Sequence, residues 1–119
     1  MNQEEAVEKV KFFKAQNKGL MSEIQYIEIA KLLTELSPCN FLVFGLGEDS
    51  YLWQDINSEG TNVFLEDDTD WIDKFKESTL DIRKVTYTTQ IKDVNDIQFN
   101  TDLLTLNLDD DLRKTNWDL

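Results

Sequence analysis

The segment that most constrains the fold of this chain is residues 39–47, Cys-Asn-Phe-Leu-Val-Phe-Gly-Leu-Gly. Residues 39–45 are nearly all apolar and do not alternate with polar residues, which predicts a central parallel strand covered on both faces. Gly45 and Gly47 follow directly, and residues 49–57 have the pattern of a short helix. An apolar strand that turns through glycines into a helix is typical of a parallel α/β unit.

The same alternation continues along the chain. We predict a second strand over residues 61–65, a helix over 69–78 and a third strand over 81–88, which is more polar and therefore nearer an edge. After residue 88 the pattern weakens to loop with one short helix, until residues 117–119 resemble the start of another strand. The sequence thus predicts an α/β fold whose parallel sheet has three to four strands.

Two helices are predicted ahead of this sheet. The first spans residues 3–16, and the second begins after Ser22, which forms a capping box with Gln25. Ser37 and Pro38 end the second helix, because the residue before a proline is pushed out of the α region. The apolar face expected for the second helix consists of Ile24, Ile27, Ala30, Leu33 and Leu36.

The chain is expected to form a single domain with two parts. Its 119 residues are enough for one modest hydrophobic core. We expect residues 1–36 to form a helical segment that packs on the sheet, and residues 37–119 to form the α/β part.

The predicted strand ends carry a candidate ligand site. Open parallel sheets bind ligands at the carboxyl ends of their strands, where glycine lets the main chain approach a ligand closely. Gly45 and Gly47 lie at the end of the first strand, and Asp49 follows at the start of the helix. Glu66 lies at the end of the second strand, where a carboxylate can accept hydrogen bonds from ribose hydroxyls. The arrangement predicts a nucleoside-containing ligand, and a tight turn without any ligand is the alternative.

Ser50 distinguishes between kinds of nucleoside ligand. At this position the dinucleotide fingerprint has Gly or Ala, where the helix must pack closely to seat a pyrophosphate. Ser50 therefore disfavours NAD and favours a nucleoside without a pyrophosphate, such as S-adenosylmethionine.

The composition excludes several other partners. The net charge is −12, from 24 acidic and 12 basic residues, which disfavours binding to nucleic acid or to an anionic membrane. No apolar run approaches the roughly 20 residues of a membrane span, and the first residues lack the basic start of a signal peptide. Cys39 is the only cysteine, which predicts a buried thiol in a reduced compartment and, by default, a cytoplasmic protein.

One stretch resembles a known family. "SPCNFLVFGLG", then "DS", "LW" and "VFLEDD" with Trp71, is similar to the plant glucuronoxylan 4-O-methyltransferase and irregular-xylem family, the DUF579 or polysaccharide-biosynthesis domain. The resemblance runs from about Met21 to the C-terminus. It implies a Rossmann-like, class I methyltransferase fold and methyl transfer from S-adenosylmethionine to a glucuronic acid hydroxyl of xylan or a similar polysaccharide. For the site it implies cofactor contacts by Gly45, Gly47, Asp49 and Ser50, with Glu66 at the ribose.

The chain departs from this family in three ways. Glu48 stands where the family usually has histidine, and the Golgi membrane anchor of the plant members has no counterpart here. "TNWDL" at the end resembles the beginning of a family strand that continues into an Asp-Gly-Pro segment. The resemblance therefore implies a C-terminally truncated member that carries the cofactor half of the site and is inactive as an isolated chain.

Catalytic groups are not identifiable from the sequence. No base for the acceptor hydroxyl can be assigned, since Asp67 and Asp68 are expected to cap a helix and be solvated. The run Asp109-Asp110-Asp111 lacks the spacing of a calcium loop, which predicts a solvated acidic turn and no metal site. Trp53 and Trp71 lie on predicted helix faces, which favours core packing over stacking on a ligand.

Two other functions stay open at this point. The chain could be a non-catalytic module that uses a short parallel sheet for self-association or for binding a protein partner, because an unpaired sheet edge tends to be covered. An NAD-linked enzyme is the third alternative, and it requires dinucleotide binding despite Ser50.

Overall fold

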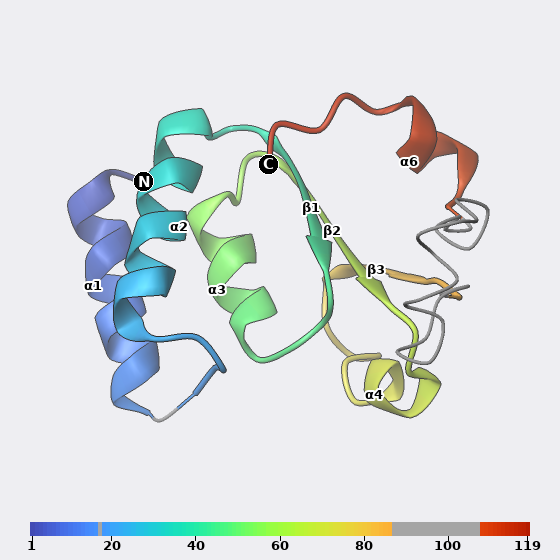
Figure 1. The fold of residues 1–119 in the computed structure, drawn as a ribbon, viewed down its shortest axis with the longest axis horizontal. Helices are drawn as coiled ribbons and strands as arrows, with labels where there is room; N and C mark the ends of the chain where they lie inside the picture. The colour runs from blue at the N-terminus through green and yellow to red at the C-terminus, as the bar shows by residue number, and fades with distance from the viewer. Residues whose placement is uncertain (17, 87–107) are drawn as a thin grey trace, which may run out of the picture.

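The protein contains a parallel sheet of three strands (Figure 1). The computed structural model describes residues 1–16, 18–86 and 108–119. Strand β1 spans Asn40–Phe44, β2 spans Thr61–Glu66 and β3 spans Asp81–Lys84, in the order β1-β2-β3. Both pairs are parallel, with Phe44 opposite Leu65 and Glu66 opposite Lys84. The predicted α/β class and the parallel sheet are confirmed, and among the described residues the third strand lies at an edge of the sheet.

Helices precede, connect and follow the strands. Helix α1 spans Gln3–Ala15, α2 spans Glu23–Leu36, α3 spans Asp49–Ile56, α4 spans Thr69–Asp73 and α6 spans Asp110–Lys114. The capping box of Ser22 and Gln25 is present as predicted. Helix α4 is shorter than the predicted 69–78, because its last turns change to i→i−3 hydrogen bonds such as Ser78 N to Phe75 O. The third strand is likewise shorter than 81–88, and residues 87 and 88 lie outside the described part of the chain.

The two faces of the sheet are covered by different elements. Helices α1, α2 and α3 lie on one side and α6 on the other (Figure 1). Phe41 and Phe64 contribute to the core on the side of α1–α3, which also contains Ala6, Val10, Phe13, Tyr26, Ala30, Leu33, Trp53 and Phe75. On the opposite face, Val63 and Leu65 pack with Val85 and with Leu112 of α6. The burial of Trp53 in the first core confirms the prediction made for that residue.

Strand β2 is more deeply buried than β1. Val63, Phe64 and Leu65 of β2 are almost completely inaccessible to solvent, whereas Phe44 at the end of β1 is 64% exposed. The prediction that the first strand is covered on both faces is confirmed in part: Phe41 packs in one core and Leu42 against the other, while Phe44 is exposed. Although β1 is the more apolar strand in sequence, β2 is the more deeply buried, so apolar content alone does not rank the burial of the two strands.

The buried face of α2 also differs from the prediction. Tyr26, Ala30 and Leu33 are its buried residues, while Ile24 is 73% exposed. These three residues have the i, i+4, i+7 spacing of one helical face, rotated away from the face expected from Ile24 and Ile27. Tyr26 occupies the centre because its ring packs between Phe13 and Trp53, at centroid distances of 5.4 and 5.7 Å.

Residues 116–119 lie along β1 and run in its direction. Asp118 N donates to Asn40 O at 2.8 Å, and Leu42 N donates to Leu119 O at 3.0 Å. The backbone groups of Cys39 and Gly45 point the other way, since they pair with Thr61 and Leu65. Alternate residues of a strand point to opposite edges, so residues 116–119 occupy the edge of β1 that β2 does not. The predicted strand start at residues 117–119 is thus found as a backbone-paired segment, and the spatial order reverses at β1.

A buried asparagine holds the beginning of β1. Asn57, which is 0% exposed, accepts from Ser37 Oγ and Cys39 N and donates to Cys39 O and Asn62 Oδ1, over 2.8–3.1 Å. Asn62 Nδ2 returns a hydrogen bond to Asn57 O. The turn after α3 is thereby fixed to the first residues of both β1 and β2.

The acidic run at the start of α6 binds an arginine. Arg83 of β3 forms ion pairs with Asp81, Asp109 and Asp111 at 2.7–3.1 Å. These hydrogen bonds lower the pKa of Asp111 and raise that of Arg83. The run is exposed to solvent, as predicted, but its pairing with Arg83 was not foreseen because Arg83 is distant in sequence. The run attaches α6 to the edge of the sheet.

Two further expectations concern single features. Cys39 is a buried free thiol, as predicted, and its burial together with the nearby Asp118 raises its pKa. Among residues 1–16, 18–86 and 108–119, no helix has the length and apolar character needed to cross a membrane.

Candidate functional site

The turn after β1 consists of Gly45, Leu46 and Gly47, and we call it the glycine turn. Its main chain is open on one side at Gly45. Gly45 has a φ of +117°, in the region that favours glycine, and its N–H donates to Leu65 O of β2 at 2.7 Å. A Cβ atom added at Gly45 would meet no atom within 4 Å. The main chain at Gly45 is therefore accessible to a ligand at close range, and the strain of a positive φ is the reason that a side chain is disfavoured there.

Glu66 connects the ends of the two neighbouring strands. Its Oε1 accepts from Leu46 N at 3.1 Å, and its Oε2 accepts from the N–H groups of Asp67 and Asp68, also at 3.1 Å. The carboxylate thus points toward the glycine turn, as the sequence predicted. A carboxylate offers about four acceptor positions, so three bonds leave room for a ligand hydroxyl.

Ser50 supports the turn from inside. Its Oγ accepts from Gly47 N at 3.0 Å, and its own N–H donates to Gly47 O at 3.0 Å. The residue is only 1% exposed. The structure therefore places the Ser50 hydroxyl within the turn, behind the main chain of Gly47.

The N–H groups of the turn are already paired. Gly45, Leu46 and Gly47 donate to Leu65 O, Glu66 Oε1 and Ser50 Oγ respectively. A phosphate cradle needs such N–H groups to be free to point at the ligand. The geometry of residues 45–47 thus does not provide one.

Asp49, the first residue of α3, contacts α2. Its Oδ2 accepts a hydrogen bond from the Tyr26 hydroxyl at 3.1 Å. Burial, followed by the charge and hydrogen bond of Asp49, raises the pKa of Tyr26, which keeps the phenol protonated as a donor. Asp49 thereby connects the glycine turn to the N-terminal helices.

Residues 45–47 and Asp49 line a pocket of about 520 Å³ at the carboxyl end of β1, which we call the turn pocket. Glu66 and Ser50 are not among its lining residues; each contacts the turn from behind, Glu66 at Leu46 N and Ser50 at Gly47 N. Its size is within the usual range for a small-molecule site. Of its described lining residues, Glu48 and Asp49 carry negative charge and none is a lysine or arginine. The full lining consists of Gly19, Leu20, Met21, Tyr26, Val43, Phe44, Gly45, Leu46, Gly47, Glu48, Asp49 and Trp71. Carboxylates and aromatic faces together favour a ligand that carries positive charge.

Trp71 packs against the core beside Phe75, at a ring-centroid distance of 5.4 Å, and also lines the turn pocket. Its side chain is half-buried, and Nε1 donates to Leu46 O at 2.5 Å. Lys74 Nζ lies 4.8 Å from the centre of its ring. The predicted core packing of Trp71 is thus confirmed, and its indole N–H in addition finds an acceptor in the turn. Asp68 positions this region by capping α4, as predicted, through bonds to Asp70 N and Trp71 N.

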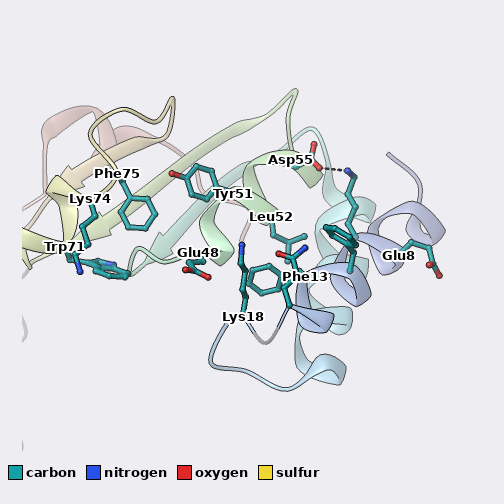
Figure 2. A pocket seen from close by; sticks show the side chains of 13 residues that line it. Glu8, Phe13, Lys18, Glu48, Tyr51, Leu52, Asp55, Trp71, Lys74 and Phe75 are labelled. Atoms are coloured by element: carbon teal, nitrogen blue, oxygen red, sulfur yellow. Dashed lines mark ion pairs between the residues drawn. The ribbon is translucent and has the colours of Figure 1, made fainter.

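A larger and shallower groove of about 1,050 Å³ lies beside the turn pocket (Figure 2). It runs between α1, α3 and the segment after α4, with Trp71 and Phe75 at one end and the Lys9–Asp55 ion pair near the other. Its charged residues are of both signs and include Lys18, Lys74 and Glu48. We place the candidate site in the turn pocket, because only that pocket contains the glycine turn and lies at the strand ends where parallel sheets bind ligands.

Sequence reasoning missed part of this site. Neither Tyr26 nor the residues at 19–21 were singled out, although Tyr26 has the spacing of a buried face with Ala30 and Leu33. No pattern in the sequence could have shown that residues 19–21 approach the glycine turn. Within the described residues, no group of three or more His, Cys, Asp or Glu side chains is arranged to hold a metal ion.

Comparisons with known proteins agree on one family. The model of the IRX15/IRX15L/GXM family matches residues 22–103. Three similar proteins are from Arabidopsis thaliana. Glucuronoxylan 4-O-methyltransferase 2 is 46% identical over 67 residues, which cover 55% of this chain and 23% of that protein. Arabinogalactan O-methyltransferase 2 is 60% identical over 42 residues, which cover 35% of this chain and 14% of that protein. Protein IRX15-LIKE is 32% identical over 80 residues, which cover 65% of this chain and 25% of that protein.

The chain spans about a quarter or less of the length of these relatives. No solved structure matches it.

Proposed function

This chain belongs to the IRX15/IRX15L/GXM family, and we propose that its described residues form the S-adenosylmethionine half of a polysaccharide O-methyltransferase site. Relatives are named as methyltransferases of glucuronoxylan and of arabinogalactan. The proposed acceptor is accordingly a hydroxyl of a uronic acid branch on a polysaccharide of that kind. The proposed fold is the Rossmann-like, class I methyltransferase type, supported by the reversal of spatial order at β1.

The observation that carries this proposal is the link between Glu66 and the glycine turn. The Glu66 carboxylate bonds Leu46 N from the end of the neighbouring strand, beside the open main chain of Gly45. In nucleoside sites of parallel sheets, an acid at this place accepts hydrogen bonds from the ribose hydroxyls. Three of about four acceptor positions of Glu66 are occupied, and we assign the fourth to a ribose hydroxyl.

The choice of S-adenosylmethionine over a dinucleotide follows from charge and hydrogen bonding. The N–H groups of residues 45–47 have partners in the protein, so a pyrophosphate would find no free donors there. The lining of the turn pocket contributes Glu48, Asp49 and aromatic rings. This lining favours a sulfonium cation and repels an anionic pyrophosphate.

When bound, S-adenosylmethionine supplies the methyl group that is transferred. In the proposed site Glu66 holds the ribose, Gly45 allows close approach, and Ser50 and Trp71 keep the turn in position. Such positioning accounts for much of the rate gain in an in-line displacement. A base that takes the acceptor proton is also required, and we assign none among the described residues.

Calorimetric titration tests the proposal. We expect the full chain to bind S-adenosylmethionine and S-adenosylhomocysteine with a Kd of roughly micromolar to millimolar, and to bind NAD⁺ at least tenfold more weakly. Gly45→Ala should reduce the affinity for S-adenosylhomocysteine about tenfold, because a methyl group at φ +117° strains the turn and points into open pocket space.

Two results would contradict the proposal. The first is a folded sample that gives no heat with either adenosyl compound. If such a sample also self-associates in sedimentation, the non-catalytic interaction module becomes the better account. The second is NAD⁺ binding as tight as that of S-adenosylhomocysteine, which would favour the dinucleotide alternative.

A further inference from the structure

We propose that residues 19–21 form a wall of the S-adenosylmethionine pocket and that Tyr26 is the positioning residue that holds this wall in place. The inference rests on the proposed function, because it concerns the same pocket. It extends beyond the family match, which begins at residue 22 and so does not include the wall. The segment that precedes α2 thereby becomes part of the donor site.

One hydroxyl connects this wall to the glycine turn. Tyr26 OH accepts a hydrogen bond from Leu20 N at 3.2 Å and donates one to Asp49 Oδ2 at 3.1 Å. Asp49 begins the helix that follows the turn. A displacement of residues 19–21 would therefore break the bond from Leu20 N to the Tyr26 hydroxyl, whose other hydrogen bond is to Asp49 beside the turn.

The wall is held at two further points. Lys14 Nζ donates to Lys18 O at 3.1 Å and to Met21 O at 2.8 Å, and so closes the loop between α1 and α2. Gly19 has a φ of +79°, and a Cβ there would overlap the Tyr26 hydroxyl. The segment is thus fitted against Tyr26, which is fully buried.

Leu20 suggests what the wall is for. Its side chain is 104% exposed, yet the residue lines the turn pocket together with Met21 and Phe44. A fully exposed leucine adds nothing to the hydrophobic core. An apolar side chain held at the mouth of a pocket by a rigid backbone can instead cover a bound ligand.

The test uses two variants and a matched control in the full chain, titrated with S-adenosylhomocysteine. Tyr26→Phe removes the hydroxyl and retains the ring that packs on Phe13 and Trp53. We expect affinity to fall about five- to tenfold, the usual range for one lost hydrogen bond. Leu20→Ser should lower affinity about threefold without changing stability, because little apolar surface is lost from the core. Tyr51→Phe makes the same chemical change outside the turn pocket and should leave affinity unchanged.

Hydrogen exchange separates this positioning role from a purely structural one. In the wild-type chain, S-adenosylhomocysteine should slow exchange of the amides at residues 19–22. Wild-type affinity in both Tyr26→Phe and Leu20→Ser would overturn the inference alone, as would unchanged exchange at residues 19–22 in the ligand-bound wild type. Should Tyr26→Phe fail to fold, Leu20→Ser and the exchange measurement decide. If the wild-type chain binds no adenosyl compound, the proposed function fails and this inference fails with it.

Discussion

Asn57→Ala is expected to lower the free energy of unfolding by about 3–4 kcal/mol, the cost of leaving two or more buried polar groups without partners. The substitution removes four hydrogen bonds, which involve Ser37, Cys39 and Asn62. Cys39 N and Asn62 Oδ1 are buried and would each lose their hydrogen bond to the Asn57 side chain. Since domains of this kind are stable by about 5–15 kcal/mol, the loss is a large part of the total.

Urea unfolding followed by circular dichroism measures this effect. Asn116→Ala is a matched control, because Asn116 is exposed and the substitution should change stability by less than about 0.5 kcal/mol. If the free energy of unfolding of Asn57→Ala lies within about 1 kcal/mol of the wild-type value, the polar network does not stabilise the starts of β1 and β2.

Glu66→Gln is expected to weaken the binding of S-adenosylhomocysteine about 10- to 100-fold, which is the usual value for hydrogen bonds to a charged group. The carboxylate accepts from Leu46 N on one oxygen and from Asp67 N and Asp68 N on the other. A glutamine must turn its NH₂ toward one of these donor sets, so either rotamer breaks contacts. The turn and the ribose position are thus both affected.

Glu59→Gln provides the matched control for charge. Glu59 is exposed in the turn before β2, at the opposite end of that strand from Glu66. The Glu59→Gln substitution removes the same charge from the protein and should leave the affinity for S-adenosylhomocysteine unchanged. Equal losses in the two variants would mean that Glu66 acts through overall charge, and unchanged binding in Glu66→Gln would remove its proposed role at the ribose.

The sequence predicted those parts of the fold that depend on neighbouring residues. Short segments determine three such features: the capping box of Ser22, the turn at Gly45 and the end of β2 at Glu66. Parallel pairing of β1 with β2 follows from the crossover through α3. These features together were enough to bring Glu66 beside the glycine turn.

The sequence did not predict features that depend on distant contacts. Tyr26 is buried where Ile24 was predicted to be, because the Tyr26 ring packs between Phe13 and Trp53. Its hydroxyl also has an acceptor in Asp49. Similarly, Trp71 is directed by the carbonyl of Leu46. Hydropathy ranks an isoleucine above a tyrosine, and only the tertiary structure supplies the partners that make the polar residue the better choice.

The pairing of residues 116–119 with β1 bears on the site as well. It places a backbone-paired segment on each side of β1, so the spatial order reverses at that strand. Reversal points are where open parallel sheets form their ligand crevices. The turn pocket lies at the carboxyl end of this same strand.

Amide chemical-shift mapping by NMR, with ¹⁵N-labelled chain and S-adenosylhomocysteine, determines whether the ligand binds beside the link between Glu66 and the glycine turn. We expect the largest shifts at residues 44–50 and 66–68, on both sides of the bond between Leu46 N and Glu66. Shifts confined to α1 and to residues 51–55, which line the groove of Figure 2, would contradict this expectation.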